Sequence, residues 1–211
     1  MQRIGALEEE IQWYKNELEK FTGNIQPDLI EIGIDPTIYR YTHARVTQNQ
    51  SFGTNNYIIL NKGRNHGIEE DMAVVSVKGI VGVVSIVSPN YSRVMPILNP
   101  GSPPVCMIKN TRFFGPLFWD GKDSRYISLR DLPSHASYAI GDTVVTSGHS
   151  AIFPEGVFVG VIEDTYKQKN EESNSLKVRL FTDFSTLNDV LIIRNPFREE
   201  QLQIMKGIGG K

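Results

Sequence analysis

The residues of this chain that could carry nucleophilic chemistry are its serines, its histidines and its one cysteine. The stretch Ser147-Gly148-His149-Ser150 invites comparison with a serine hydrolase. A nucleophile elbow requires Gly-x-Ser-x-Gly at a turn from a strand into a helix, which presents the serine to its base. Residues 148–152 read Gly-His-Ser-Ala-Ile, so the second glycine is missing, and no helical pattern follows.

A catalytic triad could still be assembled from distant residues, with His43 and Asp71 beside a serine elsewhere in the chain. Acyl transfer by such a triad needs the three side chains in contact and an oxyanion hole of backbone amides. No Gly-Asp-Ser-Gly run marks a nucleophile turn. A trypsin-like serine hydrolase on a double β-barrel is therefore the alternative and not the leading interpretation.

Metal, disulfide and phosphate chemistry find no support in the spacing of candidate ligands. The four histidines are His43, His66, His135 and His149. None of them lies at a spacing typical of metal ligands. The single cysteine, Cys106, cannot form an intramolecular disulfide, and its apolar neighbours predict a buried small hydrophobe. No Gly-rich phosphate loop is present. We predict no catalytic residue, no metal and no cofactor.

An aromatic cluster near Lys109 and Arg112 is the remaining candidate for binding. On a barrel, such a cluster could stack single-stranded bases, or it could be core with a few exposed members that dock a protein. The chain carries 22 Lys and Arg against 24 Asp and Glu, and this net charge of -2 argues against a nucleic-acid-binding barrel. We predict a partner surface formed by Phe113, Phe114, Phe118 and Trp119.

Two kinds of element must position these residues, and the first is a helix at the start of the chain. Apolar residues recur at spacings of three and four at Ile4, Leu7, Ile11, Tyr14, Leu18, Phe21 and Ile25. This a/d pattern predicts a dimerising coiled coil over residues 1–27 that continues upstream, although a helix lying on the protein's own core would share the pattern. We expect Gly23 and Pro27 to end the helix and residues 28–40 to form a connector.

The second kind of element is the short strand. Glycine, asparagine and proline turns separate twelve β-like runs: Tyr41–Val46, Tyr57–Leu60, Ala73–Val77, Ile80–Val87, Arg93–Ile97, Pro104–Ile108, Phe113–Phe118, Tyr126–Leu129, Thr143–Thr146, Val157–Asp164, Lys177–Phe181 and Asp189–Ile193. Their number and length predict a mainly β fold of small barrels or a sandwich. No run of about 18 apolar residues could span a membrane.

Several stretches together resemble the MreC family of bacterial rod-shape-determining proteins. They are Ile58-Ile59-Leu60-Asn61-Lys62-Gly63 through Gly67 and Met72-Ala73-Val74; Gly79-Ile80-Val81-Gly82; Gly141-Asp142-Thr143 through Thr146-Ser147-Gly148; and Phe153-Pro154-Glu155-Gly156 through Gly160. Most of these glycines fall where turns and barrel bends need open backbone angles, and Asp142 is placed to close a turn.

The resemblance implies two small six-stranded β-barrels, similar to chymotrypsin-like barrels but non-catalytic, behind an N-terminal coiled-coil helix. We expect the first barrel in residues 41–88 plus 164–195 and the second in residues 89–163. A consecutive split of the chain is the alternative. Residues 196–211, which end in Gly-Ile-Gly-Gly-Lys, are expected to form a flexible tail.

The resemblance also implies a function. Members of the family are scaffolds of the cell-elongation machinery that dimerise and organise peptidoglycan synthesis. Their partners are a class B penicillin-binding transpeptidase, MreD and a RodA-type glycosyltransferase. The family resides on the periplasmic side of the cytoplasmic membrane, held by a single-pass anchor that this sequence lacks. We therefore expect the chain to be the part of such a protein that lies outside the membrane.

Overall fold

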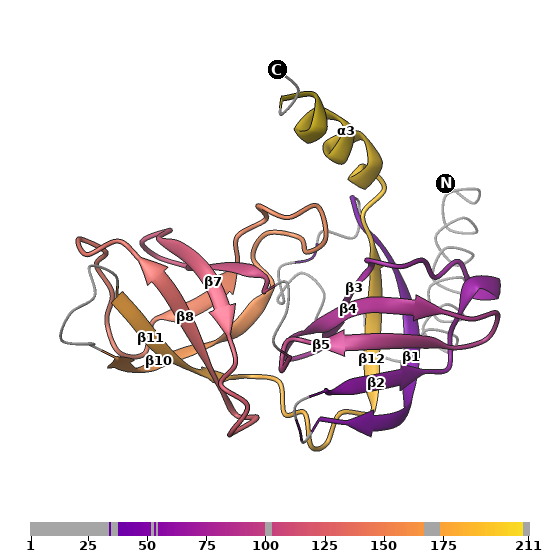
Figure 1. Cartoon of the computed structure of the whole chain (residues 1–211), viewed down its shortest axis with the longest axis horizontal. Coiled ribbons are helices and arrows are strands. Elements are labelled where there is room, and N and C mark those ends of the chain that lie inside the picture. The colour runs from indigo at the N-terminus through magenta and orange to yellow at the C-terminus, as the bar shows by residue number, and fades with distance from the viewer. Residues whose placement is uncertain are drawn as a thin grey trace, which may run out of the picture.

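The computed structural model contains two closed antiparallel β-barrels and a C-terminal helix (Figure 1). The structure describes residues 34, 38–51, 53, 55–99, 103–166 and 174–208. Each of the twelve predicted runs overlaps a strand. The prediction of a mainly β protein with two six-stranded barrels is confirmed.

The first barrel closes in the order β1-β12-β3-β4-β5-β2. Its strands are β1 (Arg40–Gln50), β2 (Tyr57–Leu60), β3 (Ala73–Ser76), β4 (Gly79–Val87), β5 (Ser92–Pro96) and β12 (Asp189–Arg194). A short 3-10 helix, Arg64–His66, follows β2. A register shift in the β3–β4 pair leaves Val81 as one extra residue beside Gly82, which forms a bulge in β4.

The second barrel closes in the order β10-β11-β8-β7-β6-β9. Its strands are β6 (Val105–Ile108), β7 (Phe114–Phe118), β8 (Tyr126–Leu132), β9 (Thr143–Thr146), β10 (Phe158–Tyr166) and β11 (Asn174–Leu180). Side chains alternate along them, so that in β8 Ile127 and Leu129 are buried while Ser128 and Arg130 are partly exposed.

The barrel boundaries predicted from the sequence need correction. The predicted second barrel, residues 89–163, includes β5, yet Val94 of β5 pairs with Ile58 and Val84 and thereby closes the first barrel. The predicted return segment, residues 164–195, includes β11, which pairs with β8 and β10 in the second barrel. Strand partners are chosen by contacts between distant segments, so the local pattern of a short apolar strand does not reveal them.

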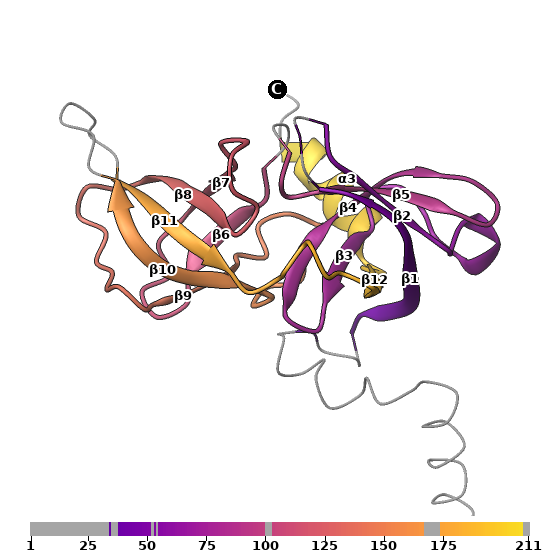
Figure 2. The same cartoon turned by 90° about the horizontal axis from the view of Figure 1, so that it is seen from below.

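The chain returns from the second barrel to the first through residues 181–188, and this crossing ties the barrels together (Figure 2). Thr182 is buried there; its Oγ1 donates to the Ile80 carbonyl oxygen at 3.0 Å and lies 3.3 Å from Ser76 Oγ. The buried Phe184 offers its carbonyl oxygen to Asn49 Nδ2 at 2.6 Å. These buried hydrogen bonds fix the crossing segment to the first barrel.

The end of the chain also differs from the prediction. Residues 198–208 form the helix α3 (Arg198–Ile208), which projects away from both barrels (Figure 1), whereas a flexible tail is predicted for 196–211. Asn195 accepts a hydrogen bond from the Phe197 amide at 3.0 Å through its Oδ1, and Pro196 stands between them. Asn before Pro is a favourable helix start, and Glu199 and Glu200 suit the positive end of the helix.

The predicted coiled-coil seam from Ile4 to Ile25 and most of the connector lie outside the described residues. So do residues 167–173, between β10 and β11. The dimerising helix therefore stays a prediction from the heptad spacing.

Candidate partner-binding surface

The outer side of β7 presents two aromatic rings to solvent. Side chains alternate along this strand, so that Gly115 and Leu117 face the barrel interior while Phe114 and Phe118 face outward. Phe114 is 51% exposed and Phe118 is 38% exposed. We call these two residues, with Arg130 of β8 and His149 of the β9–β10 loop, the β7 face.

Arg130 holds the ring of Phe118 in place from the neighbouring strand. Its guanidinium carbon lies 3.6 Å from the ring centroid. The two strands are paired here, with Leu117 opposite Leu129. An exposed cation–π contact of this kind contributes roughly 0.5–1 kcal/mol. Because Arg130 lies over the ring of Phe118, the outer surface presents a positive charge and an apolar ring side by side.

Phe114 is held by the loop between β9 and β10. The rings of Phe114 and His149 have centroids 4.6 Å apart and planes tilted by 34°. Arg112, just before β7, reaches the same loop and pairs with Glu155 at 2.9 Å. Both ends of the β7 face are therefore supported by contacts from other elements, the next strand at Phe118 and the β9–β10 loop at Phe114.

Two of the four aromatic residues predicted for a partner surface lie apart from the β7 face. Trp119 is 5% exposed, and its Nε1 donates to the Asp123 carbonyl oxygen at 3.1 Å. Phe113 is half-buried against the core and meets His135 edge-on at 5.5 Å. Successive side chains of a strand point to opposite faces, so the cluster is divided between the two sides of the sheet. The alternation can be followed in the sequence of β7, Phe-Gly-Pro-Leu-Phe.

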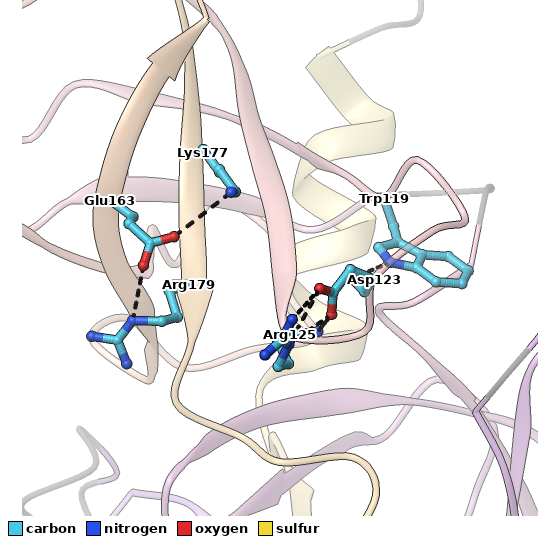
Figure 3. A network of polar contacts seen from close by, with 6 residues as sticks. All are labelled: Trp119, Asp123, Arg125, Glu163, Lys177 and Arg179. Carbon is cyan, nitrogen blue, oxygen red and sulfur yellow. Dashed lines mark hydrogen bonds and ion pairs between the residues drawn. The ribbon is translucent and has the colours of Figure 1, made fainter.

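A set of ion pairs extends the surface from β8 across β11 to β10 (Figure 3). Arg125 binds Asp123 in two-pronged fashion, with Nε 3.0 Å from Oδ1 and Nη2 2.7 Å from Oδ2. These hydrogen bonds, together with the Arg125 backbone amide, lower the pKa of Asp123 to about 2. The Asp123 carboxylate thus stays ionised throughout the physiological range.

Tyr126 forms the aromatic centre of this extension. Lys177 Nζ lies 4.0 Å from its ring centroid, and the Arg125 guanidinium lies 5.5 Å from it. Glu163 of β10 stands between Lys177 and Arg179, at 3.7 Å and 3.5 Å (Figure 3). The composition of the sequence did not single out these side chains, because the strands that carry them are adjacent only in the closed barrel.

The residues considered for catalysis are not brought together. His43 Nε2 pairs with Asp189 at 3.1 Å, while Asp71 pairs with Arg198 at 2.7 Å. Cys106 is buried, and burial raises the pKa of its thiol, so the reactive thiolate is disfavoured. In the part of the chain that the structure describes, no group of three or more His, Cys, Asp or Glu side chains could hold a metal ion.

The Thr-Ser-Gly and Phe-Pro-x-Gly stretches form one local structure at the base of the β9–β10 loop. Thr146 Oγ1 donates to the Pro154 carbonyl oxygen and accepts from the Val157 amide at 2.9 Å. Ser147 Oγ donates to the Val105 carbonyl oxygen at 2.9 Å. These residues therefore shape the loop that carries His149 and Glu155.

Other residues of the proposed family motif hold turns or allow two backbone segments to approach closely. Asp142 Oδ2 accepts from the Ala139 amide at 2.8 Å and closes the turn before β9. A β-carbon on any of three glycines would lie 2.1–2.3 Å from a carbonyl oxygen of another segment: Gly63, Gly82 and Gly160. Close backbone approach explains why a glycine suits these positions.

Comparison with known protein families gives a match over most of the barrels. Residues 46–194 match the model described as "Rod shape-determining protein MreC, barrel core". The cell shape-determining protein MreC of Listeria monocytogenes is 27% identical over 161 residues, which is 74% of this chain and 54% of that protein. Its counterpart in Cereibacter sphaeroides is 26% identical over 168 residues, 80% of this chain and 53% of that protein. The chain thus spans about half the length of these relatives.

Solved structures share the fold. An MreC structure from L. monocytogenes superposes with a TM-score of 0.67 at 24% identity, covering 92% of this chain and 95% of that one. A structure described as the major periplasmic domain of the cell shape-determining filament MreC gives 0.65 at 21% identity, with coverages of 74% and 96%. MreC of Helicobacter pylori in complex with a penicillin-binding protein gives 0.58 at 21% identity, with coverages of 75% and 99%.

Proposed function

Because residues 46–194 match the MreC barrel core, the chain belongs to the MreC family of rod shape-determining proteins, and we propose that it is a non-enzymatic scaffold of the cell-elongation machinery. Its work would be to hold peptidoglycan-synthesis enzymes in place. The separation of His43 from Asp71 and the burial of Cys106 support a scaffold over a hydrolase.

The observation that carries this proposal is the exposed β7 face on a closed barrel. A closed barrel has no free strand edge, so a partner cannot extend the sheet and must bind to outward side chains. Phe114 and Phe118 supply apolar contact, and Arg130 supplies a charge beside them. Aromatic residues and arginine are the types most often found at the centres of protein interfaces.

We propose a class B penicillin-binding transpeptidase as the partner of the β7 face. The H. pylori relative solved with a penicillin-binding protein supports this class of partner. MreD and a RodA-type glycosyltransferase complete the proposed assembly. A second copy of the chain, joined through residues 1–27, would make the scaffold a dimer.

We place the scaffold on the periplasmic side of the cytoplasmic membrane, in keeping with the neighbour described as a periplasmic domain. Within the described residues, no helix combines the length and apolar character needed to cross a membrane.

Binding to the periplasmic region of the elongation transpeptidase from the same organism tests the proposal. The double variant Phe114→Ala/Phe118→Ala should weaken binding at least tenfold, because it removes both exposed rings. The control is Ile86→Ala/Tyr91→Ala on the first barrel, whose side chains are similarly exposed, at 53% and 52%. It should bind like the native chain. Equal binding by both double variants would rule out the β7 face, and no binding by the native chain would count against this partner.

A further inference from the structure

The helix α3 has an apolar face that no described element covers. The Gln201 amide donates to the Phe197 carbonyl oxygen at 3.0 Å, so Phe197 already belongs to the first helical turn. Ile204 stands seven residues later, two turns along the same side. Phe197 is 53% exposed and Ile204 is 60% exposed. The opposite side carries Glu199, Gln203 and Lys206.

The base of α3 is nevertheless fixed to the barrels. Arg198 Nη2 binds Asp71 Oδ2 at 2.7 Å. Asn195 Nδ2 donates to the Ala151 carbonyl oxygen at 3.1 Å and to Gln201 Oε1 at 3.0 Å. These contacts set the direction in which the helix leaves the molecule, so its apolar face is presented in one orientation.

The strand register shows which segment of the chain can reach this face. β1 and β12 are antiparallel, and Arg40, where β1 begins, pairs with Arg194, where β12 ends. Tyr39 and Asn195, which flank this pair, therefore lie at the same end of the first barrel. Residues 26–39 can span up to about 46 Å when extended, which exceeds the length of α3, about 16 Å.

The heptad segment carries apolar residues that a two-stranded seam does not use. Ala6 and Trp13 are seven residues apart and fall at the c position, on the side of the predicted helix away from the a residues, and Glu10 and Glu17 at g separate them from the d residues. In a coiled-coil dimer this position faces away from the partner helix. A tryptophan there has no role in the seam, and with Ala6 it would form a separate small apolar patch on the outer side of the helix.

We propose that α3 packs its Phe197–Ile204 face against the Ala6–Trp13 flank of the heptad helix of its own chain. The contact leaves the a/d seam free for the dimer and joins the coiled coil to the first barrel. It would turn a short helix that is marginal alone into part of a small helical bundle. The direction of the coiled coil would then be fixed relative to the barrels.

Hydrogen exchange on the full chain tests this packing, at a concentration where sedimentation velocity finds a monomer. Residues 4–25 should be protected from exchange, and Ile204→Glu should lower their protection at least fivefold. Gln203→Glu, on the polar side of α3, should leave it unchanged. Amides of β3 and β12 should keep their protection in both variants, which establishes that the barrels remain folded.

The reciprocal measurement follows the amides of α3. Trp13→Gln should lower their protection, whereas Lys20→Gln, at the next c position, should not. An unprotected heptad segment in the monomer would assign the α3 face to another chain and overturn the proposal. Unchanged exchange in Ile204→Glu and Trp13→Gln would overturn it as well. Neither outcome depends on whether the transpeptidase binds the β7 face.

Discussion

Arginine side chains on the second barrel illustrate how single residues build its surface. The guanidinium of Arg130 lies against the ring of Phe118, whereas that of Arg125 binds Asp123 with two nitrogens. Both contacts use the planar, forked shape of the group, which the ammonium of lysine lacks. Replacement of either arginine by lysine would keep the charge and lose the geometry.

The Asp123–Arg125 pair has a measurable pH dependence. The pKa of Asp123 is lowered to about 2, chiefly by the Arg125 hydrogen bonds, whereas an unfolded aspartate titrates near about 3.9. Because the folded-state value is the lower one, the pair stabilises the fold above about pH 4, and this contribution is lost as the pH falls toward 2. A carboxyl titration by NMR should place the midpoint of Asp123 near 2.

The Arg125→Ala variant should raise that midpoint toward the ordinary value of an aspartate. Lys122→Ala is the matched control, because Lys122 pairs with Asp120 at 4.0 Å rather than with Asp123. It should leave the midpoint almost unchanged. A native midpoint near 4 would contradict the assigned contact.

At the scale of elements, the β3–β4 hairpin of the first barrel packs against β10 of the second. All four residues of β3 are buried, as are the first four of β4. Ser76 Oγ accepts from the Lys78 and Gly79 amides, both at 3.2 Å, and so holds the turn. The turn then packs against the backbone of β10 at Phe158.

Gly79 should be intolerant of even a small side chain. Its φ is +148°, and a β-carbon would lie 2.3 Å from the Phe158 carbonyl oxygen. Gly79→Ala should lower the free energy of unfolding by about 2 kcal/mol or more, since backbone strain and overpacking each cost roughly 1–3 kcal/mol. Urea denaturation followed by tryptophan fluorescence measures this loss.

The Gly121→Ala variant distinguishes the effect of backbone strain from that of overpacking. Gly121 also has a positive φ, +81°, but a β-carbon there would meet no atom within 4 Å. This variant should show the strain without the clash, and its loss of stability should be clearly smaller. Equal losses in the two variants would mean that the inter-barrel contact at Gly79 contributes nothing.

At the scale of the whole molecule, the helix α3 and the proposed partner surface belong to different barrels. The chain enters and leaves the first barrel at paired residues of β1 and β12, while the β7 face lies on the second barrel. The crossing at Thr182 and Phe184 connects the two. We therefore expect mutations to alter self-association and partner binding separately.

Removal of residues 1–27 should weaken self-association at least tenfold, because it deletes the entire a/d seam. Sedimentation equilibrium measures the dimer dissociation constant. Leu18→Ala, within the predicted seam, should also weaken the dimer, whereas Asn16→Ala, at the f position of the predicted heptads, should not. A truncated chain that dimerises as strongly as the native one would show that the barrels carry the contact.

Local features of the sequence were sufficient to locate the strands. Apolar runs bounded by glycine and proline turns predicted all twelve, because a strand's side-chain alternation and its terminating turn are properties of neighbouring residues. The helix α3 was also encoded locally, by Asn195-Pro196 and the two glutamates after it, but the glycine-rich end of the chain concealed that signal.

Tertiary structure alone decided which strands share a barrel and which side chains form the surface. β5 belongs to the first barrel because Val94 meets Ile58, and Lys177 joins Tyr126 only because β11 pairs with β8. Such pairings join residues tens of positions apart, and their free energy depends on closing the whole barrel. The sequence by itself therefore determined the elements and the family resemblance, while folding decided their partners and the faces they present.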